Sequence, residues 1–213
     1  SIFSNIGKFI LFILFFFKYL FSPKFYFKNN IRYFLSVFVS SIPIIALTGI
    51  FSGMVLALQS YTGFSRFSAE SAIPNIFVLT LTRELGPVLT GLMISARVGS
   101  SIAAEIATMR VTEQIDALEV MGINSINYLV FPKVIALLLY PFLISIAMFL
   151  GILGGMIACV YGGYSTMSAF IEGIQTDFIP FHMTYAFIKS FVFAFILATV
   201  PSFHGYYMTV SYT

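Results

Sequence analysis

Hydrophobic residues dominate four long stretches of this chain, and short polar connections separate them. The stretches cover about residues 38–61, 75–109, 127–161 and 183–206. At 1.5 Å per residue, a helix of about 20 residues crosses the hydrocarbon layer of a bilayer, so each stretch is long enough to span it. The pattern therefore predicts an all-α fold, a polytopic membrane bundle of about four transmembrane helices.

The N-terminal stretch, residues 2–21, is apolar but contains Lys8 and Lys18, and a basic, aromatic segment with Pro23 follows it. This pattern is typical of a helix at the membrane interface, and we favour that placement. A further span and a signal peptide are the alternatives. The lysines interrupt the run, and no small-residue cleavage site follows, which argues against a signal peptide.

Composition agrees with a membrane protein. Of the 213 residues, 59% are hydrophobic and 9% are charged, whereas about a quarter of the residues of soluble domains are charged. Four spans leave no residues for a soluble catalytic domain. We therefore expect one membrane domain over 1–213, with an interfacial helix and linker in 1–35 and the transmembrane core in 36–213.

Small residues recur every four positions within the apolar stretches. Such stripes let helix backbones approach closely in lipid, where no hydrophobic force draws helices together. We predict helix packing at Gly49, Gly53, Gly99, Ala103, Gly151 and Gly155.

The remaining candidate chemistry is sparse. The net charge of +3 does not indicate nucleic acid, because five of the eleven Lys and Arg residues lie in the first 32 positions, where anionic headgroups are the expected partner. Cys159 is the single cysteine and fits a packing role, while His182 and His204 lie too far apart along the fourth stretch for a joint metal site. No phosphate loop, zinc spacing or nucleophile with its base occurs. We expect no catalytic residue, no metal and no cofactor bound by this chain.

Charge is concentrated in one segment, Arg83 to Gly122, which holds five of the eight acidic residues. Arg83 and Glu84 lie well inside the second stretch, where ionisable groups are costly and normally face protein or a wet cavity. The two readings are an internal ion pair that orients helices and the lining of a cavity. Counting about 100° per residue places Gly91 and Ser95 on the face of Glu84. Pro87 should bend the helix.

The end of this segment predicts a short amphipathic helix between the second and third spans. Thr112 would cap it and Gly122 would end it. Its apolar arc contains Ile115, Ala117, Leu118 and Met121, and its polar arc contains Glu113, Asp116 and Glu119. It is either a solvated loop helix or a docking helix for a protein partner.

Topology follows from charge. The connection 162–181 contains no Lys or Arg, so the positive-inside rule places it outside. The basic N-terminus and the segment with Arg110 and Lys133 are then cytoplasmic, and the connection 62–73 is external.

The charged segment, RELGPVLTGLMISARVGSSIAAEIATMRVTEQIDALEVMG, resembles the signature of the MlaE (YrbE) family. The likeness extends from GIFSGMVLALQ at Gly49 to HGYY at His204. This family comprises the permease subunits of bacterial and plastid ABC transporters that move phospholipids between membranes and maintain lipid asymmetry. The resemblance implies a homodimer in a bacterial inner membrane, with an organelle inner envelope as the alternative.

The same resemblance implies partners and site residues. A cytoplasmic ATPase would hydrolyse ATP, and an MCE-type substrate-binding protein would lie on the other side. The segment 112–122 is similar to a short EAA loop, the part of ABC permeases that docks on the ATPase. The implied coupling residues are Thr112, Glu113, Ile115, Asp116, Ala117, Leu118, Met121 and Gly122. The candidates for the lipid path are Leu58, Arg83, Glu84, Gly91, Ser95 and Arg97.

One departure from the family pattern concerns the C-terminus. The family continues after GYY with a glycine-rich segment and a last span, whereas this chain ends at MTVSYT. We expect either a fragment or a natural truncation. The alternatives in function are a secondary transporter, in which Glu84, Arg97 and Glu105 relay ions, and a membrane scaffold without transport activity.

Overall fold

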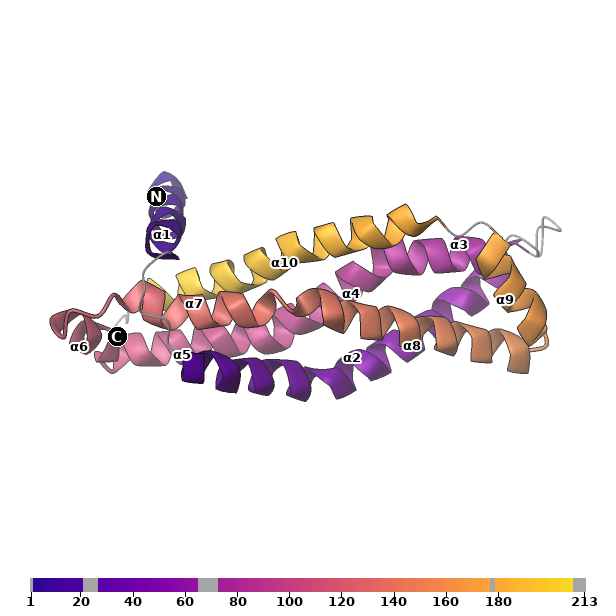
Figure 1. Cartoon of the computed structure of the whole chain (residues 1–213), viewed down its shortest axis with the longest axis horizontal. Coiled ribbons are helices and arrows are strands. Elements are labelled where there is room, and N and C mark those ends of the chain that lie inside the picture. The colour runs from indigo at the N-terminus through magenta and orange to yellow at the C-terminus, as the bar shows by residue number, and fades with distance from the viewer. Residues whose placement is uncertain (1, 21–26, 65–72, 177–178, 209–213) are drawn as a thin grey trace. The chain divides into compact units, whose positions relative to one another are not determined.

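A computed structural model describes residues 2–20, 27–64, 73–176 and 179–208, and every regular element in these ranges is a helix (Figure 1). The elements are α1 (Ile2–Leu20), α2 (Phe27–Phe64), α3 (Ile73–Thr80), η3 (Leu81–Leu85), α4 (Gly86–Ile94), η4 (Ser95–Gly99), α5 (Ser100–Val111), α6 (Gln114–Val120), α7 (Ser125–Leu137), α8 (Tyr140–Tyr161), α9 (Met167–Thr176) and α10 (Pro180–Tyr206). The prediction of an all-α fold is confirmed.

Four helical stretches in the described part of the chain are long and apolar enough to cross a membrane. They are Phe38–Phe64, Ile73–Val111, Ser125–Tyr161 and Pro180–Tyr206. These bounds confirm the four predicted spans. Most of the predicted external connection 62–73, at 65–72, lies outside the described residues.

The chain divides into two compact units. One contains residues 1–40, 94–139 and 193–213, and the other contains residues 41–93 and 140–192. The single membrane domain with a boundary near residue 35 stays a prediction. Each unit is described by itself below.

In the unit of 41–93 and 140–192, α2 packs on α8 through glycine. A Cβ atom built on Gly49 would lie 2.6 Å from the carbonyl oxygen of Ala147, and one built on Gly53 would overlap the carbonyl of Gly151. The two backbones therefore touch, which is possible only where side chains are missing or very small.

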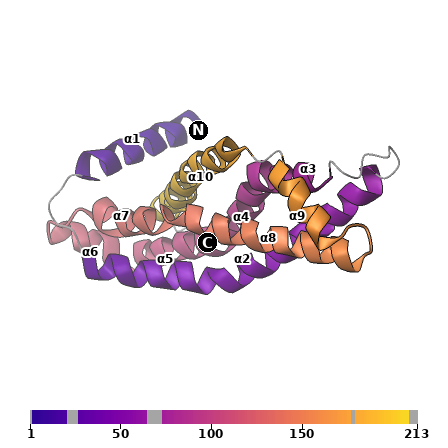
Figure 2. The same cartoon turned by 45° about the vertical axis from the view of Figure 1, so that its right-hand side comes forward.

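The same unit has an aromatic core next to this contact. Phe77 of α3 and Phe170 of α9 are buried, with ring centroids 5.9 Å apart, and Gly155 of α8 leaves room for the Phe77 ring. Cys159 is fully buried in this cluster. In both views α9 lies beside α3 (Figure 2), as their contacts require.

In the other unit, aromatic side chains join α1 to α10. Phe12 and Phe16 are buried, and they contact Phe203 and Phe195 with ring centroids 5.7 and 6.3 Å apart. Because one side of α1 is covered by protein, its exposed residues form the other side. Whether α1 lies at the membrane interface stays a prediction.

Candidate functional site

The first charged part of the second span is built around a π-helical turn. In η3 the backbone N–H of Gly86 donates to the carbonyl of Leu81, five residues back. Pro87 has no N–H, so it cannot donate a hydrogen bond to the carbonyl of Arg83, four residues before it. Lys189 of α10 replaces the missing donor, because its Nζ donates to the Arg83 carbonyl oxygen at 3.2 Å. A π turn therefore precedes Pro87, and the predicted bend of the helix stays a prediction.

Glu84 is the centre of a charge cluster at this turn. Lys189 Nζ lies 2.7 Å from Glu84 Oε2, and Arg83 Nε lies 3.4 Å from Glu84 Oε1. The ring of Tyr185 contacts both cations, with its centroid 5.6 Å from Arg83 Cζ and 5.2 Å from Lys189 Nζ. The Arg83 and Glu84 side chains are about half exposed, at 48% and 53%. An ion pair, one of the two alternatives given for Arg83 and Glu84, is therefore present. The exposed side of these two side chains can still contact a neighbour or ligand.

Sequence reasoning did not identify Lys189 as the partner of Glu84, because 105 residues separate them. One signal pointed that way. Lys189 is the only Lys or Arg in the fourth span, and a cation at such depth normally pairs with an anion or a backbone carbonyl.

Gly91 lies next to the hydroxyl group of Tyr140. The Tyr140 hydroxyl donates to the carbonyl oxygen of Pro87 at 2.7 Å, and a Cβ on Gly91 would lie 3.0 Å from the hydroxyl oxygen. Leu58 is 37% exposed on α2. Gly91 thus has a packing role, and its predicted place in a lipid path stays a prediction.

Ser95 and Arg97 lie in the second π-helical turn, η4, where the N–H of Ser100 donates to the carbonyl of Arg97. Both side chains are exposed, and the Arg97 guanidinium donates to the backbone carbonyl of Ser40 in α2. These two residues belong to a different compact unit from Glu84. The predicted common face of Glu84, Gly91 and Ser95 stays a prediction, and the count of 100° per residue does not hold through π turns.

A second ion pair joins α5 to α7. Lys133 Nζ lies 2.6 Å from Glu105 Oε2, and the lysine side chain is only 3% exposed. The positive-inside count included Lys133 as part of the cytoplasmic segment. In the structure Lys133 lies in the third turn of α7. The positive charges that indicate the cytoplasmic side are therefore Arg110 and those of the N-terminus.

The predicted coupling helix is present as α6, but its start differs from the prediction. Thr112 does not cap α6. It ends α5, and its hydroxyl donates to the Thr108 carbonyl at 2.8 Å. The N-cap is Glu113, which has a left-handed φ of 58°. Its side chain makes no capping hydrogen bond. Gly122, with a φ of 72°, ends the segment as predicted.

The apolar arc of α6 is divided between the protein and its surface. Ile115 is fully buried and Leu118 is partly buried, so both pack within their own unit. Ala117 is exposed, Met121 is 65% exposed and Val120, which the predicted arc omitted, is 88% exposed. The apolar surface available to a partner is therefore the C-terminal part of α6.

Polar contacts hold α6 in place. Glu119 Oε1 accepts hydrogen bonds from Ser125 Oγ at 2.8 Å and from Tyr206 Oη at 2.9 Å, which joins α6 to α7 and α10. Arg110 Nη1 lies 2.7 Å from Asp116 Oδ1. Glu119 and Asp116 belong to the predicted polar arc, and their exposed carboxylates hold α6 on the rest of its unit.

A model of the family described as Permease MlaE matches residues 31–212. A probable ABC transporter permease protein of Rickettsia bellii is 48% identical over 205 residues, which cover 96% of this chain and 79% of that protein. The intermembrane phospholipid transport system permease protein MlaE of Haemophilus influenzae is 35% identical, over 79% of this chain and 65% of that protein. The chloroplastic protein TRIGALACTOSYLDIACYLGLYCEROL 1 of Arabidopsis thaliana is 31% identical, over 85% of this chain and 52% of that protein. The chain belongs to the MlaE family of ABC transporter permeases.

Proposed function

We propose that this chain is the membrane subunit of an ABC transporter that moves phospholipids between membranes and maintains their lipid asymmetry. The family match over residues 31–212 carries the proposal, and the name of the Haemophilus relative indicates the cargo. ATP is hydrolysed by a separate subunit. The permease works as a homodimer in a bacterial inner membrane, with an MCE-type protein as a further partner.

The ATPase docks at the exposed end of α6. Val120 and Met121 project apolar surface beside Ala117, while Ile115 and Glu119 hold the helix from behind. Burying an apolar side chain of this size contributes about 1.5–3 kcal/mol. A rigidly held helix also loses little conformational entropy on docking, which favours its role as a mechanical link.

The docking test compares two methionines. Met121→Asp places a desolvated carboxylate in the proposed contact, so recovery of a co-expressed ATPase subunit in a pull-down should fall at least tenfold. Met167→Asp is the matched control, because Met167 is 55% exposed at the start of α9 in the connection predicted to be external. Equal recovery with both variants would exclude docking through α6.

The lipid path passes the charge cluster of η3. We place Leu58, Arg83, Glu84, Gly91, Ser95 and Arg97 along it. The half-exposed Glu84 and Arg83 suit a zwitterionic or anionic headgroup, because each offers one open side while Lys189 compensates the charge. The exposed apolar surface of α2, including Leu58, suits acyl chains.

Photo-crosslinkers test this path. Crosslinking residues at Leu58, Glu84 and Ser95 should capture phospholipid, and the yield should change when the assembled transporter turns over ATP. A crosslinker at Phe149, which is 62% exposed on α8, is the control for contact with bulk lipid and should be insensitive to ATP. An ATP-insensitive yield at Glu84 and Ser95 would remove them from the path.

Reconstitution distinguishes the alternative functions. The purified permease with its ATPase, in vesicles of phosphatidylethanolamine and phosphatidylglycerol, should transfer labelled phospholipid only with hydrolysable ATP. Transfer driven by a proton gradient without ATP would favour a secondary transporter, in which Glu84, Arg97 and Glu105 act as relays. No transfer under either condition, with all partners present, would favour a scaffold.

A further inference from the structure

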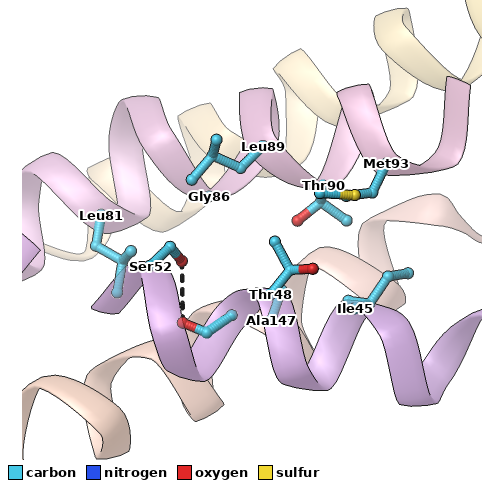
Figure 3. A pocket seen from close by; sticks show the side chains of 10 residues that line it. Ile45, Thr48, Ser52, Leu81, Gly86, Leu89, Thr90, Met93 and Ala147 are labelled. Carbon is cyan, nitrogen blue, oxygen red and sulfur yellow. Dashed lines mark hydrogen bonds between the residues drawn. The ribbon is translucent and has the colours of Figure 1, made fainter. Parts of the chain in front are cut away.

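A small cavity with three hydroxyls in a mainly apolar lining lies between α2 and α4, beside the π-helical turn, in the unit of 41–93 and 140–192 (Figure 3). Thr48 and Ser52 line it from α2, and Gly86, Thr90 and Met93 line it from α4. It offers the centre of a water molecule a volume of about 10 Å³. One ordered water needs about this much space, together with two to four polar partners.

Thr90 is a buried hydroxyl without a partner among the described residues. Its side chain is 4% exposed. Thr82 and Thr199 show the usual solution in a span, since each hydroxyl donates to the carbonyl four residues earlier, at 2.7 and 2.8 Å. Thr90 makes no such bond, and its oxygen faces the gap between the two helices (Figure 3). A buried hydroxyl normally has a hydrogen-bond partner, so the cavity should hold one.

The two hydroxyl groups on the α2 side already use their hydrogens in hydrogen bonds. Thr48 Oγ1 donates to the Ile44 carbonyl at 2.7 Å, and Ser52 Oγ donates to the Gly49 carbonyl at 3.0 Å. Each oxygen therefore keeps only lone pairs for a further bond. Both oxygens can therefore only accept a further hydrogen bond, whereas the Thr90 hydroxyl can still donate one.

We propose that this cavity binds one water molecule, which accepts a hydrogen bond from Thr90 and donates hydrogen bonds to Thr48 and Ser52. The water uses both of its hydrogens and one lone pair, so every polar group is satisfied. It joins α4 to α2 next to the turn that carries Glu84. The inference does not depend on what the protein transports.

The competing arrangement is a dry cavity. Thr90 could rotate about χ1 and donate to the carbonyl of Gly86, four residues earlier, as Thr82 does to Val78. The hydroxyls of Thr48 and Ser52 would then face a void with no ligand.

X-ray radiolysis of the full chain in lipid nanodiscs distinguishes the two arrangements. Radiolysis of bound water produces hydroxyl radicals that oxidise neighbouring side chains. Met93 lines the cavity and is the reporter, whereas Met156 is similarly half-buried but packs against the apolar cluster around Phe77. With water bound, Met93 should oxidise several-fold faster than Met156.

Two variants at position 90 link the signal to the hydroxyl. Thr90→Val keeps the shape but removes the donor, and Met93 oxidation should fall to the rate of Met156. Thr90→Ser keeps the donor and should preserve the fast rate. Equal Met93 rates in the wild type and Thr90→Val would overturn the proposal. If Thr90→Val does not assemble, a wild-type Met93 rate no higher than that of Met156 overturns it, as does a high-resolution map without density within hydrogen-bond distance of Thr90 Oγ1.

Discussion

Single atoms decide how closely α2 and α8 approach. Gly53 and Gly151 face each other so that backbone meets backbone, and a methyl group on Gly53 would overlap the Gly151 carbonyl. Backbone atoms cannot move aside as flexible side chains can. This contact is therefore the least tolerant of added volume among those described for the unit of 41–93 and 140–192.

We predict that Gly53→Ala destabilises the protein by about 1–3 kcal/mol through overpacking. Gly63→Ala is the control, because Gly63 is in the same helix and no atom lies within 4 Å of its added Cβ. Thermal unfolding in detergent should show a lower midpoint for Gly53→Ala and an unchanged or slightly higher one for Gly63→Ala. Equal midpoints would contradict the close contact.

The charges of η3 depend on one another in the same local way. Lys189→Met removes the partner of Glu84 and also leaves the Arg83 carbonyl without its donor. The thermal midpoint should therefore fall more for Lys189→Met than for Glu84→Gln. The double variant should lose less than the two single variants together, since both remove the same ion pair. Strictly additive losses would show that the pair contributes nothing.

Sequence reasoning located these charged residues but not their partners. Depth in an apolar stretch marked Arg83 and Glu84, because charge there is costly whatever surrounds it. Lys189 and Lys133 pair with residues 105 and 28 positions away. Such pairings depend on which helices pack together, and hydropathy along one chain does not contain that information.

At the scale of elements, α6 is a short helix that other elements keep in place. Seven residues are too few to form a stable isolated helix. Ile115 supplies an apolar anchor, and Glu119 supplies a polar one through Ser125 and Tyr206. The position of the proposed docking surface therefore depends on side chains in α7 and α10.

Tyr206→Phe should loosen α6 because it removes one of the two donors to Glu119. A hydrogen bond of this kind contributes about 0.5–1.5 kcal/mol, so amide hydrogen exchange in residues 114–120 should accelerate up to about tenfold. Tyr207→Phe serves as the control, since Tyr207 is next in the chain and its side chain makes ring contacts but no hydroxyl hydrogen bond within the described residues. Unchanged exchange in Tyr206→Phe would show that the bond does not hold α6.

The start of α6 shows why element boundaries were harder to predict than elements. Thr112 looked like an N-cap, since Thr is common there and a helical pattern follows. The chain instead turns at Glu113 in the left-handed region, which non-glycine residues seldom adopt. Nothing in the local sequence distinguishes that turn from a capped start, whereas Gly122 ended the helix as its residue type indicates.

At the scale of the whole molecule, the four spans followed from length and hydropathy alone. No span in the described residues was missed, because every stretch long enough to cross the bilayer must satisfy its backbone as a helix. The π turn η3 was not predicted, since it involves a tertiary contact, the bond from Lys189 to the Arg83 carbonyl.

Topology can be tested with single cysteines in a Cys159→Ala background. Glu172→Cys, in α9, should react with a membrane-impermeant maleimide added from outside, and Gln114→Cys, at the start of α6, should not. Both residues are exposed, so a difference in reactivity reports the side of the membrane. The reverse pattern would invert the orientation given by the positive-inside rule.

The π turn η3 is also a place where the second span should tolerate a change in length. An α-helix rotates about 100° per residue, so deleting one residue from a regular segment such as α5 turns one flank relative to the other. A π turn contains one residue more than an α turn, and removing Leu85 should restore a regular helix while Phe77 keeps its place against α9. Deletion of Leu85 should therefore leave a folded, monodisperse protein by size-exclusion chromatography, whereas deletion of Ser101 should not. Insertions and deletions among homologous permeases should accordingly concentrate at this turn.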